Sequence, residues 1–207
     1  MKARFFLLLM FLALLAFLVP LTYAATTITF DELSETGSGS FIANGYQGLN
    51  WSNFFANNAI LYTNQIHLVT GDYYGMVSAS NVASDYAGDP AEIDSAGTNF
   101  NFVSAYLTGF INSNLNIQVQ GFNGGTMLFN TTVVASATSP TLVTFNYLNI
   151  DRLTFSPSGG QPAFGAFPYE QFVMDNLTFE FVPEPSTFLL AALGALTLWP
   201  FLKRRRA

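Results

Sequence analysis

The chain of 207 residues has no cysteine and only one histidine. Without cysteine it has no disulfide, no thiolate nucleophile and no sulfur metal ligand, which suits either redox compartment and does not decide between them. With a single imidazole as well, any metal site would be built from oxygen ligands, for which calcium is the natural candidate.

Positive charge is almost missing from the middle of the chain. Six of the seven basic residues lie at the two ends, so Arg152 is the one cation of the body, whereas all thirteen acidic residues lie between Asp31 and Glu184. The net charge of this stretch is therefore −12. Nucleic-acid phosphates are bound by many Lys and Arg contacts, so the balance excludes nucleic acid as a partner.

The N-terminus has the parts of a secretory signal peptide over residues 1–25. A basic start with Lys2 and Arg4 precedes an apolar run from Phe5 to Val19, and Pro20 then ends the helix. Small residues follow, and they predict cleavage at Ala24 or Ala25 by the general secretion machinery. A retained N-terminal membrane helix is the alternative, and export follows in either case.

The C-terminus has a second apolar segment, predicted as a transmembrane helix over residues 187–202. At 1.5 Å per residue its fifteen-residue uncharged run, Phe188 to Leu202, spans roughly 22 Å. A hydrocarbon core is about 30 Å thick, so the segment is a marginal anchor. The cations that follow it should stay on the cytoplasmic side, which leaves the acidic body outside; they are Lys203, Arg204, Arg205 and Arg206.

Pro183-Glu184-Pro185, a short apolar helix and the basic tail 203–206 together resemble the PEP-CTERM protein-sorting signal, which would occupy residues 182–207. The resemblance implies a bacterial protein that is exported and briefly anchored in the inner membrane. It also implies recognition by an exosortase, a membrane transpeptidase that cuts near Pro183-Glu184-Pro185 and delivers the body to the cell surface or the extracellular space. The two prolines hold Glu184 in an extended backbone that such an enzyme could grip.

Residues 26–181 alternate short apolar-polar runs with clusters of Gly, Asn, Ser and Pro. In "LNIQVQ", Leu115, Ile117 and Val119 fall on one face, and similar runs occur at 143–147 and 177–181. Many short strands at this spacing predict an all-β fold, an antiparallel β-sandwich of jelly-roll type with about nine or ten strands. The best helical candidate is short, Asn53–Ile60. Three stretches, "ITFDEL", "NGYQGLNW" and "FVMDNLTF", also resemble the bodies of other proteins with this sorting signal.

Sugar binding is one predicted role of the body, because sugar platforms combine aromatic faces with amide side chains. The candidates are Tyr46, Asn50, Trp51, Tyr73, Tyr74 and Tyr86. The alternative for Trp51 is a place in the core, since Trp and Tyr are also usual core residues whose polar tips reach a partner.

A structural calcium is a second prediction, where the first and last strands meet. Its ligands would be Asp31, Glu32 and Asp175. Strict alternation turns Asp175 inward, where a carboxylate needs a cation, backbone amides or Arg152 as its partner.

Catalysis has little support in the sequence. His67, in "QIHLV", is predicted to be a half-exposed strand histidine without catalytic partners. The acids of "SDYAGDPAEID" could form a carboxylate pair for glycoside hydrolysis, and an acidic surface loop explains them equally well; they are Asp85, Asp89, Glu92 and Asp94.

The sequence thus predicts a non-enzymatic surface or matrix protein whose body binds or packs against extracellular polysaccharide. Two alternatives remain open. The body could be a structural or adhesive module that binds protein or itself, for which a long unpaired edge strand or a flat apolar patch would speak. It could also be a secreted glycan hydrolase.

Overall fold

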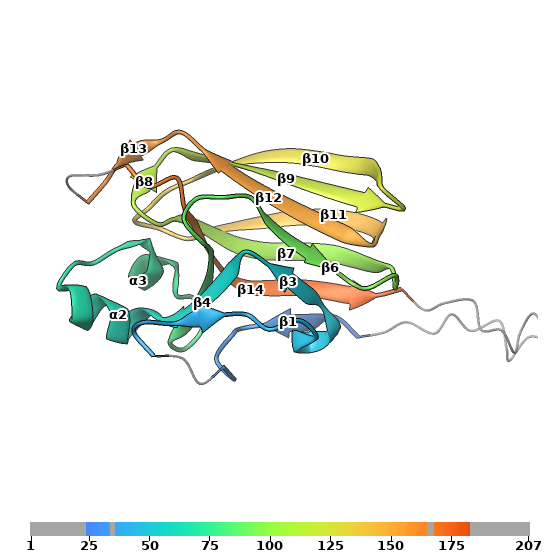
Figure 1. Cartoon of the computed structure of the whole chain (residues 1–207). Coiled ribbons are helices and arrows are strands. Elements are labelled where there is room, and N and C mark those ends of the chain that lie inside the picture. The colour runs from blue at the N-terminus through green and yellow to red at the C-terminus, as the bar shows by residue number, and fades with distance from the viewer. Residues whose placement is uncertain (1–23, 34–35, 165–167, 183–207) are drawn as a thin grey trace, which may run out of the picture. The chain divides into compact units, whose positions relative to one another are not determined.

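The computed structural model describes residues 24–33, 36–164 and 168–182, which belong to one compact unit. Two antiparallel sheets face each other, and two short helices lie at one end (Figure 1). The described residues form fourteen strands: β1 (Thr26–Ile28), β2 (Ser40–Phe41), β3 (Asn50–Ser52), β4 (Phe54–Asn58), β5 (Asn81–Asp85), β6 (Ala91–Asp94), β7 (Phe100–Gly109), β8 (Asn112–Ser113), β9 (Leu115–Asn123), β10 (Thr126–Ala135), β11 (Thr141–Ile150), β12 (Arg152–Ser158), β13 (Gln161–Pro162) and β14 (Phe172–Phe181).

The larger sheet, here sheet A, has the order β11-β7-β14-β5-β4-β2, with β1 added to β14. The facing sheet, sheet B, has the order β10-β9-β12-β6-β3, and β13 pairs with β8 in a small separate ladder. From β3 to β7 successive strands alternate between the sheets in all but one step, β4 to β5, and the hairpin β9–β10 stays in sheet B. All-β, sandwich-like architecture is confirmed, and its jelly-roll type stays a prediction.

The number of strands differs from the nine or ten expected because five of the fourteen are only two or three residues long. Alternation can reveal the longer strands that have one buried and one exposed face. In β9, Leu115, Ile117 and Val119 are fully buried while Asn116 is exposed. Ladders of two residues carry no such pattern, so sequence alternation cannot find them.

Phenylalanine dominates the core between the sheets. Phe54 from sheet A meets Phe155 of sheet B edge-on at 5.7 Å between ring centroids, and Phe172 stacks on Phe155 at 5.5 Å. All three rings are buried to 1% exposure or less. Aromatic pairs of this geometry contribute about 0.5–1.5 kcal/mol beyond the burial of their area.

Arg152, the one cation of the body, lies on β12 and is held by two neighbours. Its Nη1 donates to Glu92 Oε2 at 3.1 Å, and its guanidinium lies 4.3 Å from the centre of the Phe122 ring. Arg152 is therefore a partner of Glu92 on sheet B and not of the inward carboxylate of Asp175.

Helical structure begins where the predicted helix 53–60 should have ended. Phe54–Asn58 is strand β4, and helix α2 covers Ala59–Ile66. Asn58 sets the boundary, because its side-chain oxygen accepts from the backbone N–H of Leu61 at 3.0 Å as a helix N-cap. Two further elements are the short helix α3 (Gly71–Gly75) and the 3-10 turn Tyr46–Gly48.

α2 and α3 cover the outer face of sheet A, away from sheet B. A small second core forms there from Ala59, Val82 and Val173, with Met76 and Phe110 packed against it. Val82 and Val173 alternate along their strands with Ala83 and Met174 of the main core, so β5 and β14 are buried on both faces. This second layer of packing creates the pocket described next.

Candidate functional site

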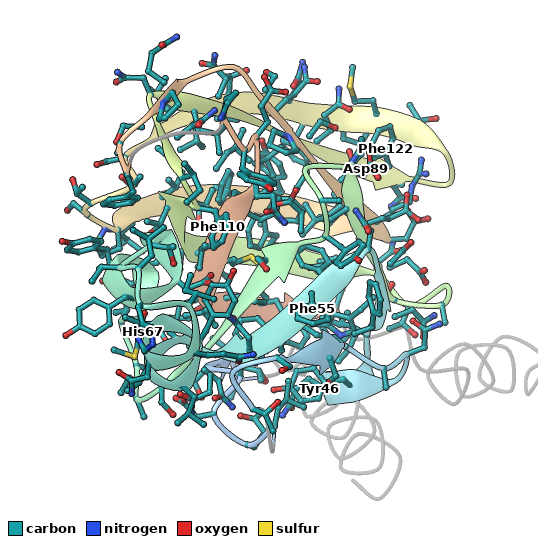
Figure 2. All side chains as sticks on the ribbon, turned by 60° about the vertical axis from the view of Figure 1, so that its left-hand side comes forward. Tyr46, Phe55, His67, Asp89, Phe110 and Phe122 are labelled. Carbon is teal, nitrogen blue, oxygen red and sulfur yellow. The ribbon has the colours of Figure 1, made fainter. Side chains whose placement is uncertain are left out.

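A pocket of about 330 Å³ opens beside the two helices, between α2, α3, β4, β5 and the chain segments around Phe110 and Tyr169. The side of the molecule that carries α2 and α3 is turned forward in Figure 2, where Phe55, His67 and Phe110 are labelled. The pocket combines aromatic side chains with buried polar groups, and the two kinds of group come from segments far apart in the sequence.

Asn57 and Asp72 bring the first polar group into the pocket. Asn57 Nδ2 donates to Asp72 Oδ2 at 3.1 Å, and both side chains are almost fully buried, at 5% and 2% exposure. Asn57 Oδ1 and Asp72 Oδ1 have no hydrogen-bond partner among the described residues. Burial, offset in part by the bond from Asn57, raises the pKa of Asp72 to about 7.

Thr70 adds a third polar atom. It precedes α3 in the N-cap position, yet its hydroxyl makes no capping bond, and its Oγ1 is buried without a partner in the described part of the chain. Gly71 follows and lies very close to the end of β7: its N–H donates to Phe110 O at 2.7 Å. A Cβ on Gly71 would sit 1.9 Å from Gly109 O, so only glycine permits α3 to begin here.

Asp85 is the second buried carboxyl group of the pocket, at the end of β5. Its Oδ1 accepts from the backbone N–H of Phe172 at 2.6 Å, and Gln171 Nε2 donates to its carbonyl oxygen at 2.8 Å. Its Oδ2 is buried and, in the described ranges, has no partner. Burial is the main cause that raises the pKa of Asp85 to about 8, so the group is protonated at neutral pH.

Aromatic rings form the walls of the pocket. Phe110 lies between Tyr62 and Tyr169, with centroid distances of 6.2 and 6.4 Å. Phe55 and Tyr86 lie 5.9 Å apart and also line it. Tyr86 and Tyr169 are each 50% exposed, so they stand at the rim. The lining therefore offers ring faces, together with residues whose buried oxygen atoms lack partners among the described residues.

Of the six residues predicted to bind sugar, Tyr86 lines this pocket and the other five do not. Trp51 is 5% exposed, and its ring packs edge-on against Phe30 and Phe54, while its Nε1 donates to Tyr46 O at 3.1 Å. The core alternative for Trp51 is therefore the correct one. Tyr46 is half-buried beside it, and Asn50 donates to Asp94 Oδ1 at 3.1 Å.

Tyr73 and Tyr74 lie on α3 rather than on a strand or loop, and they are 43% and 38% exposed. Tyr74 stacks on Phe164 at 5.7 Å and 7°. His67 is the C-cap residue of α2 and has a left-handed backbone (φ 54°). The prediction that it lies in a strand is therefore wrong.

The carboxylates proposed for calcium instead bind backbone N–H groups. Asp31 accepts from Ala79, Ser80 and Asn81 at 2.9–3.1 Å, and Asp175 accepts from Val77 and Ser78 at 2.7 and 2.8 Å. Although burial acts to raise it, these bonds hold the pKa of Asp31 below its ordinary value. For Asp175 burial outweighs its hydrogen bonds and raises the pKa.

Glu32 lies apart from that arrangement and accepts from Gln47 Nε2 at 2.7 Å. Within the residues that the structure describes, no three His, Cys, Asp or Glu side chains gather closely enough to hold a metal ion. The predicted set Asp31, Glu32 and Asp175 is thus not brought together as a three-carboxylate site.

The acids of the stretch 85–94 are also dispersed. Asp85 lies in the pocket, Glu92 pairs with Arg152, and Asp94 accepts from Asn50 and from the N–H of Ala96. The carboxylate that does share the pocket with Asp85 is Asp72, which the sequence analysis did not select.

Residues 181–206 match the family model of the PEP-CTERM protein-sorting motif. The chain carries a PEP-CTERM sorting motif. The prediction made from Pro183-Glu184-Pro185, the apolar segment and the basic tail is confirmed, and the match is consistent with an exosortase substrate. A comparison with curated proteins finds no match.

The segments that flank the body lie largely outside the described residues. These include the signal peptide up to residue 23, the sorting motif at 183–185, the predicted helix 187–202 and the tail 203–206. Ala24 and Ala25, the predicted cleavage residues, are described and are exposed ahead of β1. No helix within the described ranges has the length and apolar character to cross a membrane.

Carbohydrate-binding modules are among the solved structures similar to the body of this PEP-CTERM chain. The tandem CBM22-1–CBM22-2 domain of Paenibacillus barcinonensis Xyn10C is 10% identical with a TM-score of 0.42, covering 80% of this chain, which spans 48% of that one. TmCBM61 in complex with β-1,4-galactotriose is 11% identical, with a TM-score of 0.34 and coverages of 68% and 94%. CBM51 from Clostridium perfringens GH95 in complex with methyl-galactose is 12% identical, with a TM-score of 0.33 and coverages of 75% of this chain and 99% of that one. At these scores the similarity does not bear on the site.

Proposed function

We propose that the PEP-CTERM motif directs this protein to the cell surface and that its body binds an extracellular glycan, without catalysis, in the pocket beside α2 and α3. One observation carries the proposal: residues that line an aromatic pocket hold four buried oxygen atoms with no hydrogen-bond partner in the described part of the chain, namely Asn57 Oδ1, Thr70 Oγ1, Asp72 Oδ1 and Asp85 Oδ2.

The physical reason is the cost of leaving those atoms unpaired. A buried polar group without a hydrogen bond costs about 1–3 kcal/mol, so a ligand that supplies the missing bonds gains that energy on binding. Sugars suit the requirement, because their hydroxyl edges donate and accept hydrogen bonds while their C–H faces stack on aromatic rings. Tyr86 and Tyr169 at the rim provide such rings.

The size of the pocket narrows the class of ligand. A volume of about 330 Å³ is near the low end of the range for ligand sites. It favours a chain end or a single branching sugar over a long stretch of polymer. The two protonated carboxyl groups discriminate little between neutral and anionic sugars. The net charge of −11 on the body, by contrast, disfavours strongly acidic polymers.

Binding is favoured over hydrolysis by the state of the two carboxyl groups. Glycosidases need one carboxylate that is ionised as nucleophile or base and a second that is protonated. Burial raises the pKa of Asp72 to about 7 and that of Asp85 to about 8, so both carboxyl groups are mostly protonated at pH values below neutral. We therefore expect no release of reducing sugar from glycans that bind.

A glycan array with the full chain in detergent tests the proposal. Tyr86→Ala removes a rim ring and should weaken binding by about two- to tenfold, because stacking on an aromatic ring contributes about 0.5–1.5 kcal/mol. Tyr73→Ala is the matched control, since Tyr73 is similarly exposed but does not line the pocket. Absence of binding to any glycan, or equal losses in both variants, would contradict the proposal.

Sorting is tested separately, by mass spectrometry of the C-terminus of the surface form. Cleavage near Pro183-Glu184-Pro185 should yield a chain without Lys203 to Arg206. Replacing the three motif residues by alanine should leave the protein in the membrane fraction with its basic tail intact. A surface form that keeps the tail would contradict exosortase processing.

A further inference from the structure

One long stretch of the body contains no charged residue. Residues 95–150 contain no Asp, Glu, Lys, Arg or His, although the thirteen acids and Arg152 surround this stretch on both sides. The charge-free stretch forms β7, β8, β9, β10 and β11. The side of the sandwich that these strands form, here the neutral side, therefore has no charged residue of its own. Charge reaches it from Asp151, which accepts from the N–H of Gly124 in the β9–β10 turn at 2.7 Å, and from Arg152, which lies over the Phe122 ring of β9.

The two longest free edges of the sandwich belong to this neutral side. β10 ends sheet B and β11 ends sheet A, and each is ten residues long. The ring of Phe129 in β10 stacks on the ring of Tyr147 in β11, with 4.6 Å between centroids and 10° between planes, so the two edge strands approach each other at this point. The opposite edges are formed by β2 and β3, which have two and three residues.

β11 is poorly suited to accept a further strand. Its register with β7 shifts twice, between Thr144 and Tyr147 and between Tyr147 and Ile150. Asn146 and Asn149 have left-handed backbones (φ 51° and 57°) at these irregularities. Bulges of this kind are one of the ways in which proteins protect an edge strand from pairing.

β10 has a regular edge for most of its length. After one irregularity between Met127 and Phe129, its pairing with β9 continues without a shift to Ala135. Within the described residues β10 pairs with β9 alone. The usual protections are missing, since 129–135 contains neither proline nor any charge, and Val134 is 58% exposed.

We propose that β10 is a self-association edge, at which a second copy of this chain adds its own β10 in antiparallel orientation and joins two five-stranded B sheets into one. Antiparallel pairing of identical strands produces a closed two-fold contact, with the same residues on both sides. Charge favours contact through this side: two bodies, each with a net charge of −11, repel each other least where both present the neutral side. Sorting to one surface also raises their local concentration.

The interface is independent of the pocket, because neither β10 nor β11 lines it. Analytical ultracentrifugation of the full chain in detergent, across micromolar concentrations, should detect a dimer. Thr132→Lys places like charges opposite each other near the centre of 129–135 and should yield monomers. Asn116→Lys on the neighbouring β9 is the matched control, with the same charge change on an exposed residue away from the edge, and should leave the dimer intact.

The absence of cysteine provides a second readout. Directly opposed residues of an antiparallel pair have Cα atoms about 4.5–5.5 Å apart, within the range that a disulfide spans. Mild oxidation of Thr132→Cys should therefore yield a covalent dimer, whereas Asn116→Cys should not. A wild-type monomer, or a dimer that survives Thr132→Lys and gives no Thr132→Cys cross-link, would overturn the proposal. Glycan binding should be unchanged in both lysine variants, which separates this result from the proposed function.

Discussion

Asp31 and Asp175 are distant in sequence, yet their carboxylates bind the same stretch of backbone, the 77–81 segment between α3 and β5. Asp31 follows β1, the first strand, and Asp175 lies in β14, the last. Ser78 Oγ donates to Asp175 as well. In a chain without cysteine, this pair of carboxylates fastens the connection from the pocket helices to the core by hydrogen bonds alone.

A double-mutant cycle should reveal the shared target of these two residues. Asp31→Ala and Asp175→Ala should each lower the free energy of unfolding by about 2–3 kcal/mol, because each removes several bonds to a charged or buried acceptor. The double variant should lose about 1 kcal/mol less than the two losses together, since the second change acts on a segment already released. Urea unfolding measures all four proteins, and strict additivity would contradict a shared role.

Calcium should leave the stability of the protein unchanged. Backbone N–H groups already donate to the carboxylate oxygens of Asp31 and Asp175, in the space where a cation would have to bind. Their partial positive charge also repels a positive ion. We expect the melting temperature to be the same with millimolar calcium and with chelator. Stabilisation by calcium that disappears in Asp175→Ala would restore the structural calcium predicted from the sequence.

Stability should fall as the pH rises from about 4 toward 7, because of Asp72. Its pKa is raised from 3.8 to about 7 in the folded state, so over this interval the unfolded chain releases a proton that the folded chain keeps. Asp72 then costs at most about 1.4 kcal/mol per pH unit, and Asp85, whose pKa is raised to about 8, adds a slope of the same sign. Asp72→Asn should flatten this slope relative to the wild type, measured as unfolding free energy against pH. Parallel pH profiles for the two proteins would show that Asp72 ionises normally.

Substitution of Trp51 should affect folding and not recognition. Trp51→Ala empties a site among Phe30, Phe54 and Tyr46 and should lower the unfolding free energy by about 3–5 kcal/mol. Where the variant is still folded, its affinity for a bound glycan should equal that of the wild type. Trp51→Phe is the conservative control and should recover part of the stability. Lost affinity in a stable Trp51→Phe protein would place Trp51 in the binding site after all.

The strands could be predicted from the sequence where one face is buried and the other is exposed to solvent. Leu115, Ile117 and Val119 alternate with amide side chains, so their strand and its inner face follow from the sequence. The boundary at Asn58 was missed because "NFFANNAI" joins a strand buried on both faces to a helix start, and neither has a clear period. His67 was wrongly assigned to a strand because it lies in an apolar run, where its left-handed backbone at the end of α2 leaves no sequence signal.

The pocket could not be predicted because its parts meet only in the folded chain. Asn57, Asp72, Phe110 and Tyr169 come from β4, α3 and two connections, and no spacing relates them. The one available signal was Thr70 and Asp72 at the start of a short Gly-bounded segment, "TGDYYG", which is typical of a helix start and says nothing of a binding site. Tyr86 was selected together with five residues that lie outside the pocket, whereas Phe110 and Tyr169, which line it with Tyr86, were not selected.

The fastening of the 77–81 segment has a thermodynamic consequence for recognition. α2 is capped at its first turn by Asn58, α3 is fixed at its start by the bond from Gly71 to Phe110, and the carboxylates of Asp31 and Asp175 hold the chain that leaves it. Such walls are preorganised, so a ligand meets them without having to immobilise a loop. Association should then be accompanied by little loss of conformational entropy in the protein, and by amide hydrogen exchange in residues 59–81 that is slow before any ligand is added.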